Sequence, residues 1–200
     1  MICFFDLILL PYAIDVILTC ARIFDWNPHI ACDVSACPYV HAKGAFLMLE
    51  TGQQAPDFSL NTDTSSFRLA DYRGKNVVVF FFPKADTSGC TKEAIAFSSL
   101  QAEFDAANTV VIGISRDDVK KQAKFREKHA LNCLLGADID GTVCEAFGVW
   151  VEKSMYGRKY MGIQRATFLI GPDGALTHMW PKVKVPGHAE DVLECLQAGG

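Results

Sequence analysis

The residue best placed to do chemistry in this sequence is Cys90, which stands between an apolar run and a helical pattern. It lies in the segment 81–93, FFPKADTSGCTKE. A buried strand that leads directly into a helix presents unpaired N–H groups and the positive end of the helix dipole, and both stabilise an anion. A helix N-terminus with a nearby cation lowers the pKa of a thiol and favours its thiolate. The segment therefore predicts a nucleophilic Cys90, although a half-buried structural cysteine fits this position alone equally well.

A second cluster of reactive residue types lies near the N-terminus. His29, Cys32, Cys37 and His41 form the pattern H-x2-C-x4-C-x3-H. Structural zinc sites place paired ligands on tight turns and separate the pairs by a longer stretch, which this compact pattern lacks. We therefore interpret it as chance enrichment of cysteine and expect no metal there.

The elements that must position Cys90 alternate between strands and helices. The run 77–82 is β-branched and aromatic throughout, which is typical of a central strand buried on both faces, and 91–107 has apolar residues at helical spacing. Further strands are expected over 55–60, 67–69, 109–115, 134–137, 166–170 and 175–180, and further helices over 117–130, 141–147 and 188–197. This order predicts an α/β fold with a central mixed sheet flanked by helices on both faces.

Composition divides the chain at Met48. The 200 residues carry a net charge of −4, so no basic field favours nucleic acid or anionic lipid. The leader 1–47 is far more apolar than the rest and holds four of the eight cysteines, but no Lys or Arg precedes Arg22, and its best apolar run contains Pro11 and Asp15. These features fit neither a signal peptide nor a membrane span. We expect a domain over 48–200; the leader 1–47 is assigned no function, and a wrong choice of start is one explanation for its presence.

The spacing Pro83-x3-Thr87-x2-Cys90 resembles the active-site signature of peroxiredoxins, in particular their bacterioferritin-comigratory (Q-type) branch. The resemblance runs from about residue 48 to residue 197 and includes several further motifs in the same order. They are QAPDF (54–58), LADYRG (69–74), GISRD (113–117), FGVWVEKSMYGRKY (147–160), RATF (165–168) and KVKVPGH (182–188). The resemblance implies a thioredoxin-like fold and a thiol peroxidase that uses no metal, flavin or haem.

The resemblance also implies roles for four residues. Cys90 is the peroxidatic nucleophile, Pro83 shields it from water, Thr87 hydrogen-bonds the peroxide, and Arg165 supports the thiolate. Donors aimed at the leaving oxygen stabilise the transition state because negative charge moves onto it, and an arginine stays charged throughout. Taken singly, Thr87 also fits a turn residue, Pro83 a strand terminator and Arg165 a surface charge.

The sequence departs from the branch at the step after oxidation. A sulfenic acid on Cys90 must be resolved by a second thiol before it is oxidised further. Many members of the branch carry that thiol five residues later, where this chain has Ile95, and another variant carries it in the following surface helix, where this chain has none. We expect the remaining cysteines of the domain to lie in the core, so that an external thiol reduces Cys90. These cysteines are Cys133, Cys144 and Cys195.

The expected substrates are hydrogen peroxide and organic hydroperoxides, and the expected reductant is thioredoxin, a glutaredoxin or a low-molecular-weight thiol. We expect a cytoplasmic monomer or weak homodimer that binds neither nucleic acid nor a membrane. A thiol–disulfide oxidoreductase would use Cys-x-x-Cys, which the flanks of Cys90 lack. A redox sensor or stress holdase that uses oxidation of Cys90 as a switch begins with the same sulfenic acid and stays open as the alternative.

Overall fold

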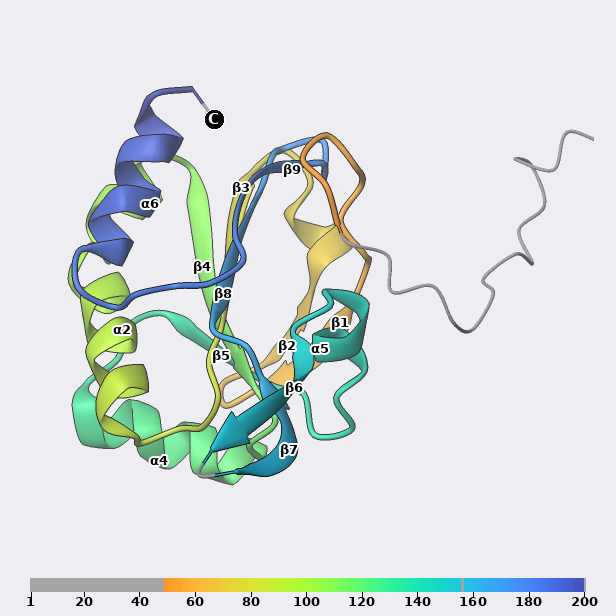
Figure 1. Ribbon diagram of the computed structural model, residues 1–200. Helices are drawn as coiled ribbons and strands as arrows, with labels where there is room; N and C mark the ends of the chain where they lie inside the picture. The colour runs from red at the N-terminus through yellow and green to blue at the C-terminus, as the bar shows by residue number, and fades with distance from the viewer. Residues whose placement is uncertain (1–48, 156, 200) are drawn as a thin grey trace, which may run out of the picture. The chain divides into compact units, whose positions relative to one another are not determined.

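The computed structural model describes residues 49–155 and 157–199. The expected leader 1–47, with its histidine and cysteine cluster, lies outside the described residues. Within them, a seven-stranded mixed sheet has the strand order β2-β1-β5-β4-β3-β8-β9, with helices on both faces, which confirms the expected fold class (Figure 1). None of the helices described is both long and apolar enough to cross a membrane.

Strands and helices alternate along most of the chain. The strands are β1 (Ser59–Thr62), β2 (Ser66–Arg68), β3 (Asn76–Phe81), β4 (Thr109–Ser115), β5 (Leu134–Ala137), β6 (Trp150–Met155), β7 (Arg158–Ile163), β8 (Ala166–Ile170) and β9 (Leu176–Trp180). The helices are the 3₁₀ helix η2 (Leu69–Tyr72) and the α-helices α2 (Ser88–Ser99), α3 (Gln101–Ala106), α4 (Val119–His129), α5 (Thr142–Ala146) and α6 (His188–Gln197).

Strand β3 is the central strand that its apolar run predicts. It pairs in parallel with β4 and antiparallel with β8, so it is hydrogen-bonded on both edges. Its side chains alternate between two separate cores because successive residues of a strand point to opposite faces. One core contains Val77, Val79 and Phe81. The other contains Val78 and Phe80, together with Phe82, which follows the strand.

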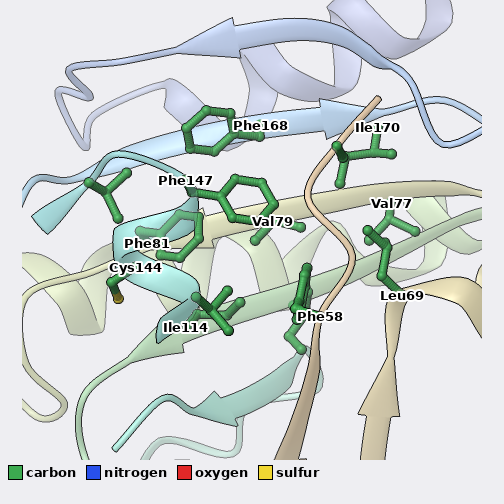
Figure 2. Close-up of a cluster of buried hydrophobic side chains, with 14 of the residues drawn as sticks. Phe58, Leu69, Val77, Val79, Phe81, Ile114, Cys144, Phe147, Phe168 and Ile170 are labelled. Carbon is green, nitrogen blue, oxygen red and sulfur yellow. The ribbon is translucent and has the colours of Figure 1, made fainter. Parts of the chain in front are cut away.

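The two cores are covered by different helices. Figure 1 shows α2 and α6 on one side of the sheet and α5 on the other. Phe97 of α2 stacks on Phe80, with ring centroids 4.6 Å apart, on the first side. On the second side, Figure 2 shows Phe147, which follows α5, beside Phe81 and Phe168, and the ring centroids of Phe147 and Phe168 lie 5.1 Å apart. The core that a side chain enters therefore shows on which face of the sheet the side chain lies.

Two expected elements differ from the structure. The expected helix over 91–107 is two helices, α2 and α3, which meet at Leu100. The Ser99 hydroxyl donates to the carbonyl of Ala96, a local side-chain bond that competes with helix continuation. The expected strand over 55–60 is shifted along the chain, because β1 runs from Ser59 to Thr62; Gln54 makes only an isolated bridge to Ala175, and Pro56 has no N–H to donate.

The β6–β7 hairpin was not expected from the sequence. Its two strands form a separate two-stranded antiparallel sheet in which Lys153 pairs with Tyr160 and Trp150 with Ile163. Most of its side chains are exposed, so it lacks the alternation of apolar and polar residues that marks a half-buried strand. The hairpin ends two residues before Arg165 and thereby places that residue and β8.

Candidate active site

Cys90 lies in the first turn of α2, where the sequence predicts it. The helix begins at Ser88 after Thr87, whose backbone is extended (φ −100°, ψ 150°). The Cys90 side chain points into the core on the α2 side of the sheet and is 1% exposed. A thiol so placed is shielded from water and lies at the positive end of the α2 helix dipole.

Arg165 reaches Cys90 through the pairing of β3 with β8. Its Nη2 atom donates to the Sγ atom of Cys90 at 3.1 Å. Phe81 at the end of β3 faces Ala166 at the start of β8, because the two strands are antiparallel. The loop from β3 to α2 therefore begins at the same end of these two strands as the residue that precedes β8. The structure thus brings together two of the four predicted site residues.

Glu93 is a site residue that was not predicted from the sequence. It lies one helical turn after Cys90, is 1% exposed, and its Oε2 atom accepts a hydrogen bond from Nη1 of Arg165. Among the residues that the structure describes, its buried Oε1 atom has no hydrogen-bond partner. Burial raises the pKa of Glu93 to about 7, although the charge of Arg165 and its hydrogen bond act in the opposite direction. The i, i+3 spacing from Cys90 on one helix face is the sequence signal that could have found it.

Thr87 and Pro83 lie in the loop between β3 and α2 and are both exposed. The Thr87 hydroxyl donates to the carbonyl of Lys84 at 3.1 Å and makes no capping bond to the helix. Pro83 comes directly after the end of the buried β3–Phe82 run, where a residue without an N–H can stop strand pairing. Both residues are therefore close to Cys90 in the chain, but in the part of the chain that the structure describes the Cys90 sulfur is hydrogen-bonded to Arg165 and not to Thr87.

The same loop is anchored to α4 and to the end of β4. Asp86 has a left-handed backbone (φ 62°), and its carboxylate binds Lys128 Nζ at 2.7 Å and His129 Nε2 at 2.8 Å. Asp117 accepts a hydrogen bond of 2.6 Å from the backbone N–H of Ala85. The hydrogen bonds from His129 and Lys128 lower the pKa of Asp86. These contacts fix the start of α2 relative to the sheet.

Lys153 adds a second positive charge near the thiol. Its Nζ atom donates to the carbonyl of Ile163 at 2.6 Å, across the β6–β7 hairpin. Burial and the charge of Arg165 lower the pKa of Lys153, while Cys90 acts to raise it.

Two of the other domain cysteines lie in the core, as expected, and the third is partly buried. Cys133 contacts the Ser98 hydroxyl at 3.5 Å, and burial raises its pKa. Cys144 of α5, which Figure 2 shows in the cluster with Phe81 and Ile114, belongs to the core on the opposite face of β3 from Cys90, and burial also raises its pKa. Cys195 in α6 is only partly buried. All three are free thiols, and among the described residues none of them is hydrogen-bonded to Cys90.

Comparison with known proteins identifies the family. Residues 51–179 match the model of the AhpC/TSA family. A putative peroxiredoxin Bcp of Coxiella burnetii is 47% identical over 148 residues, which cover 74% of this chain and 98% of the relative. Peroxiredoxin Bcp of Bacillus subtilis is 43% identical over 152 residues, 76% of this chain and 97% of the relative.

A solved structure gives the same result for the fold. The Xanthomonas campestris bacterioferritin comigratory protein, whose alkyl peroxide reduction activity is described from complexes with a trapped intermediate and a ligand, superposes with a TM-score of 0.70. It is 40% identical, and the match covers 75% of this chain and 96% of that one. The resemblance expected from the motifs is therefore confirmed: the chain belongs to the AhpC/TSA family and, within it, to the Bcp/PrxQ branch of the peroxiredoxins, which are thiol-dependent peroxidases.

Proposed function

We propose that Cys90 is the peroxidatic residue and that it reduces hydrogen peroxide and organic hydroperoxides. The contact between Arg165 Nη2 and the buried sulfur of Cys90, 3.1 Å long at a helix N-terminus, carries the proposal. The thiolate attacks the terminal peroxide oxygen, an S–O bond forms as the O–O bond breaks, and the alcohol or water leaves. Cys90 becomes a sulfenic acid. The alkyl peroxide reduction activity of the Xanthomonas relative supports organic hydroperoxides as substrates.

In this proposal Arg165 stabilises the charge that moves from sulfur to oxygen. Its two terminal nitrogens already donate hydrogen bonds to Glu93 and Cys90, so the guanidinium is held in place before the peroxide binds. A donor positioned in advance costs no reorganisation at the moment of reaction. Thr87 supplies a second donor by turning its exposed hydroxyl from the Lys84 carbonyl to the peroxide, and Pro83 limits water around the sulfur.

We further propose that an external thiol reduces the sulfenic acid. Cys133 lies beside Ser98, eight residues beyond Cys90 in the same helix, which corresponds to about 12 Å along the helix axis. Cys144 lies behind the sheet, and the exposed position of Ile95 holds no thiol. A disulfide brings the two Cα atoms within about 7 Å, so these placements support a one-cysteine cycle.

Turnover with a reducing system tests the function. With thioredoxin, its reductase and an excess of peroxide, we expect steady consumption by the full chain and none above background by Cys90→Ser. A single turnover followed by arrest, with thioredoxin, glutaredoxin and low-molecular-weight thiols each tried, would instead support a redox sensor. Mass mapping under non-reducing conditions after one equivalent of peroxide tests the cycle, because a disulfide from Cys90 to any other cysteine of the chain contradicts it.

A further inference from the structure

Glu93 carries a buried oxygen atom that the proposed peroxide chemistry leaves unused. Its Oε2 atom accepts from Arg165, whereas its Oε1 atom is buried and has no partner among the residues that the structure describes. Leaving a buried polar atom unpaired costs far more when the group is ionised than when it is neutral. The surroundings of Oε1 therefore favour a carboxylic acid over a carboxylate.

The charges at the site also favour a protonated Glu93. Cys90 and Glu93 lie three residues apart on one face of α2, and both contact the single guanidinium of Arg165. A thiolate and a carboxylate together would place two negative charges against one positive charge in a buried space. Two acids so arranged hold one proton between them, as paired carboxylates do.

The remaining charged groups decide which of the two acids holds that proton. Cys90 acts to raise the pKa of Lys153 in β6, which is the attraction expected between an ammonium group and an anion at Cys90. His188 at the start of α6 is hydrogen-bonded to the Thr167 hydroxyl at 2.8 Å, and burial lowers its pKa to about 4, so it is neutral at pH 7. The N-terminus of α2 favours an anion in its first turn, where Cys90 lies. Lys153 and the helix N-terminus therefore favour the anion at Cys90 over one at Glu93, whereas the neutral His188 favours neither.

We propose that Glu93 stores the proton that Cys90 loses when it becomes a thiolate, and that this proton returns to the oxygen that leaves the peroxide. The reduced site is then a thiolate with a neutral Glu93. Attack forms the S–O bond and breaks the O–O bond, sulfur is oxidised by two electrons, and the attacked oxygen keeps its hydrogen. The leaving alkoxide or hydroxide takes the stored proton, so a sulfenic acid and an ionised Glu93 paired with Arg165 remain.

This inference rests on the proposed function and makes a prediction about proton stoichiometry. One equivalent of hydrogen peroxide is mixed with the reduced full chain near pH 7 in weak buffer with a pH-indicator dye. In the native protein the leaving hydroxide is neutralised inside the site, so no proton is taken up from solvent. In Glu93→Gln the amide still accepts from Arg165 but stores no proton, so about one proton is taken up per sulfenic acid formed.

Matched controls separate the possible failures. Glu152→Gln removes an exposed carboxylate of β6 that pairs with Lys159 at 2.9 Å, and should behave as the native protein. Ultraviolet absorbance of the thiolate should be present in the native protein and in Glu93→Gln before peroxide is added. Equal proton uptake by the native protein and by Glu93→Gln would contradict the storage of a proton on Glu93. Failure of the native protein to form a sulfenic acid at Cys90 overturns the proposed function instead.

A second measurement uses the native protein alone. The infrared difference spectrum between the reduced and oxidised native protein should lose the carbonyl band of one carboxylic acid and gain a carboxylate band. A spectrum without that loss contradicts the storage of a proton on Glu93.

Discussion

The Nη2 atom of Arg165 lies 3.1 Å from the Sγ atom of Cys90, across 75 residues of sequence. The antiparallel register that sets Phe81 opposite Ala166 contributes to this contact, because Arg165 directly precedes β8 and Cys90 lies in the first turn of α2, which follows the loop after β3. Both strands are buried in the middle of the sheet. The guanidinium and the sulfur are therefore positioned beside two central strands, by the residue that precedes β8 and by the β3–α2 loop that Asp117 and Lys128 anchor, which suits a site that must be organised before its substrate binds.

Arg165→Lys should slow the reaction of Cys90 with peroxide by about 10²-fold. Lysine keeps the charge but has a single nitrogen at its end. It cannot donate to Glu93 and Cys90 from two separate nitrogens, as arginine does. Stopped-flow measurement of sulfenic acid formation gives the rate constant. Arg158→Lys, at an exposed position of β7, is the matched control and should react at the native rate. A native rate in Arg165→Lys would show that charge alone suffices.

Thr87→Val should lower kcat/KM for hydrogen peroxide by about 10²-fold, whereas Thr87→Ser should keep most of the activity. Valine has nearly the shape of threonine but lacks the hydroxyl, and serine retains it. In the structure the hydroxyl donates to the Lys84 carbonyl. This hydrogen bond is exposed and therefore weak, so the hydroxyl can exchange it for one to the peroxide. Steady-state assays of the three proteins measure the effect. Full activity in Thr87→Val would remove this residue from the peroxide site.

His188 should make the fold less stable in mild acid. Its pKa is about 4 in the folded chain and near 6.5 in an unfolded one, so the unfolded state takes up a proton first as the pH falls. The stability contribution is complete above about pH 6.5 and is lost as the pH falls towards 4, by at most roughly 3 kcal/mol. Urea unfolding at pH 7 and pH 4.5 should show a smaller loss in His188→Gln. Equal losses in both proteins would contradict the burial of a neutral His188.

Ser98→Ala should cost about 1–3 kcal/mol of stability. The Ser98 hydroxyl accepts from the backbone N–H of Asn132 at 3.0 Å and of Cys133 at 3.4 Å, and thereby ties α2 to the residues before β5. Urea unfolding measures the loss. Ser99→Ala, at an exposed neighbouring position, should change stability by less than about 0.5 kcal/mol. Equal effects of the two substitutions would show that the Ser98 bonds contribute nothing of their own.

Much of the fold could be predicted from the sequence because its central strands are apolar throughout. The expected ranges 109–115, 134–137 and 166–170 agree with β4, β5 and β8, and 188–197 agrees with α6. Each is a continuous or periodic pattern bounded by turn residues. The β6–β7 hairpin could not be predicted in this way, since its exposed side chains show no such pattern.

The site could be predicted only in part from the sequence. Cys90 is marked by its place between a strand and a helix, but the meeting of Arg165 with Cys90 depends on strand register, which no local pattern contains. Glu93 and Lys153 were missed for a related reason. A glutamate in a helix and a lysine in a hairpin are usually exposed, and only the packed structure shows that Glu93 is buried and that Lys153 responds to the thiol.

The central claim is that Cys90 alone reacts with peroxide, and trapping its sulfenic acid tests this most directly. The reduced full chain is treated with one equivalent of hydrogen peroxide and a carbon nucleophile that labels sulfenic acids, and is then digested and mapped by mass spectrometry. The label should appear on the peptide that contains Cys90 and on no other cysteine, and Cys90→Ser should remain unlabelled. A label on Cys133, Cys144 or Cys195 at the same dose, with Cys90 unlabelled, would contradict the account.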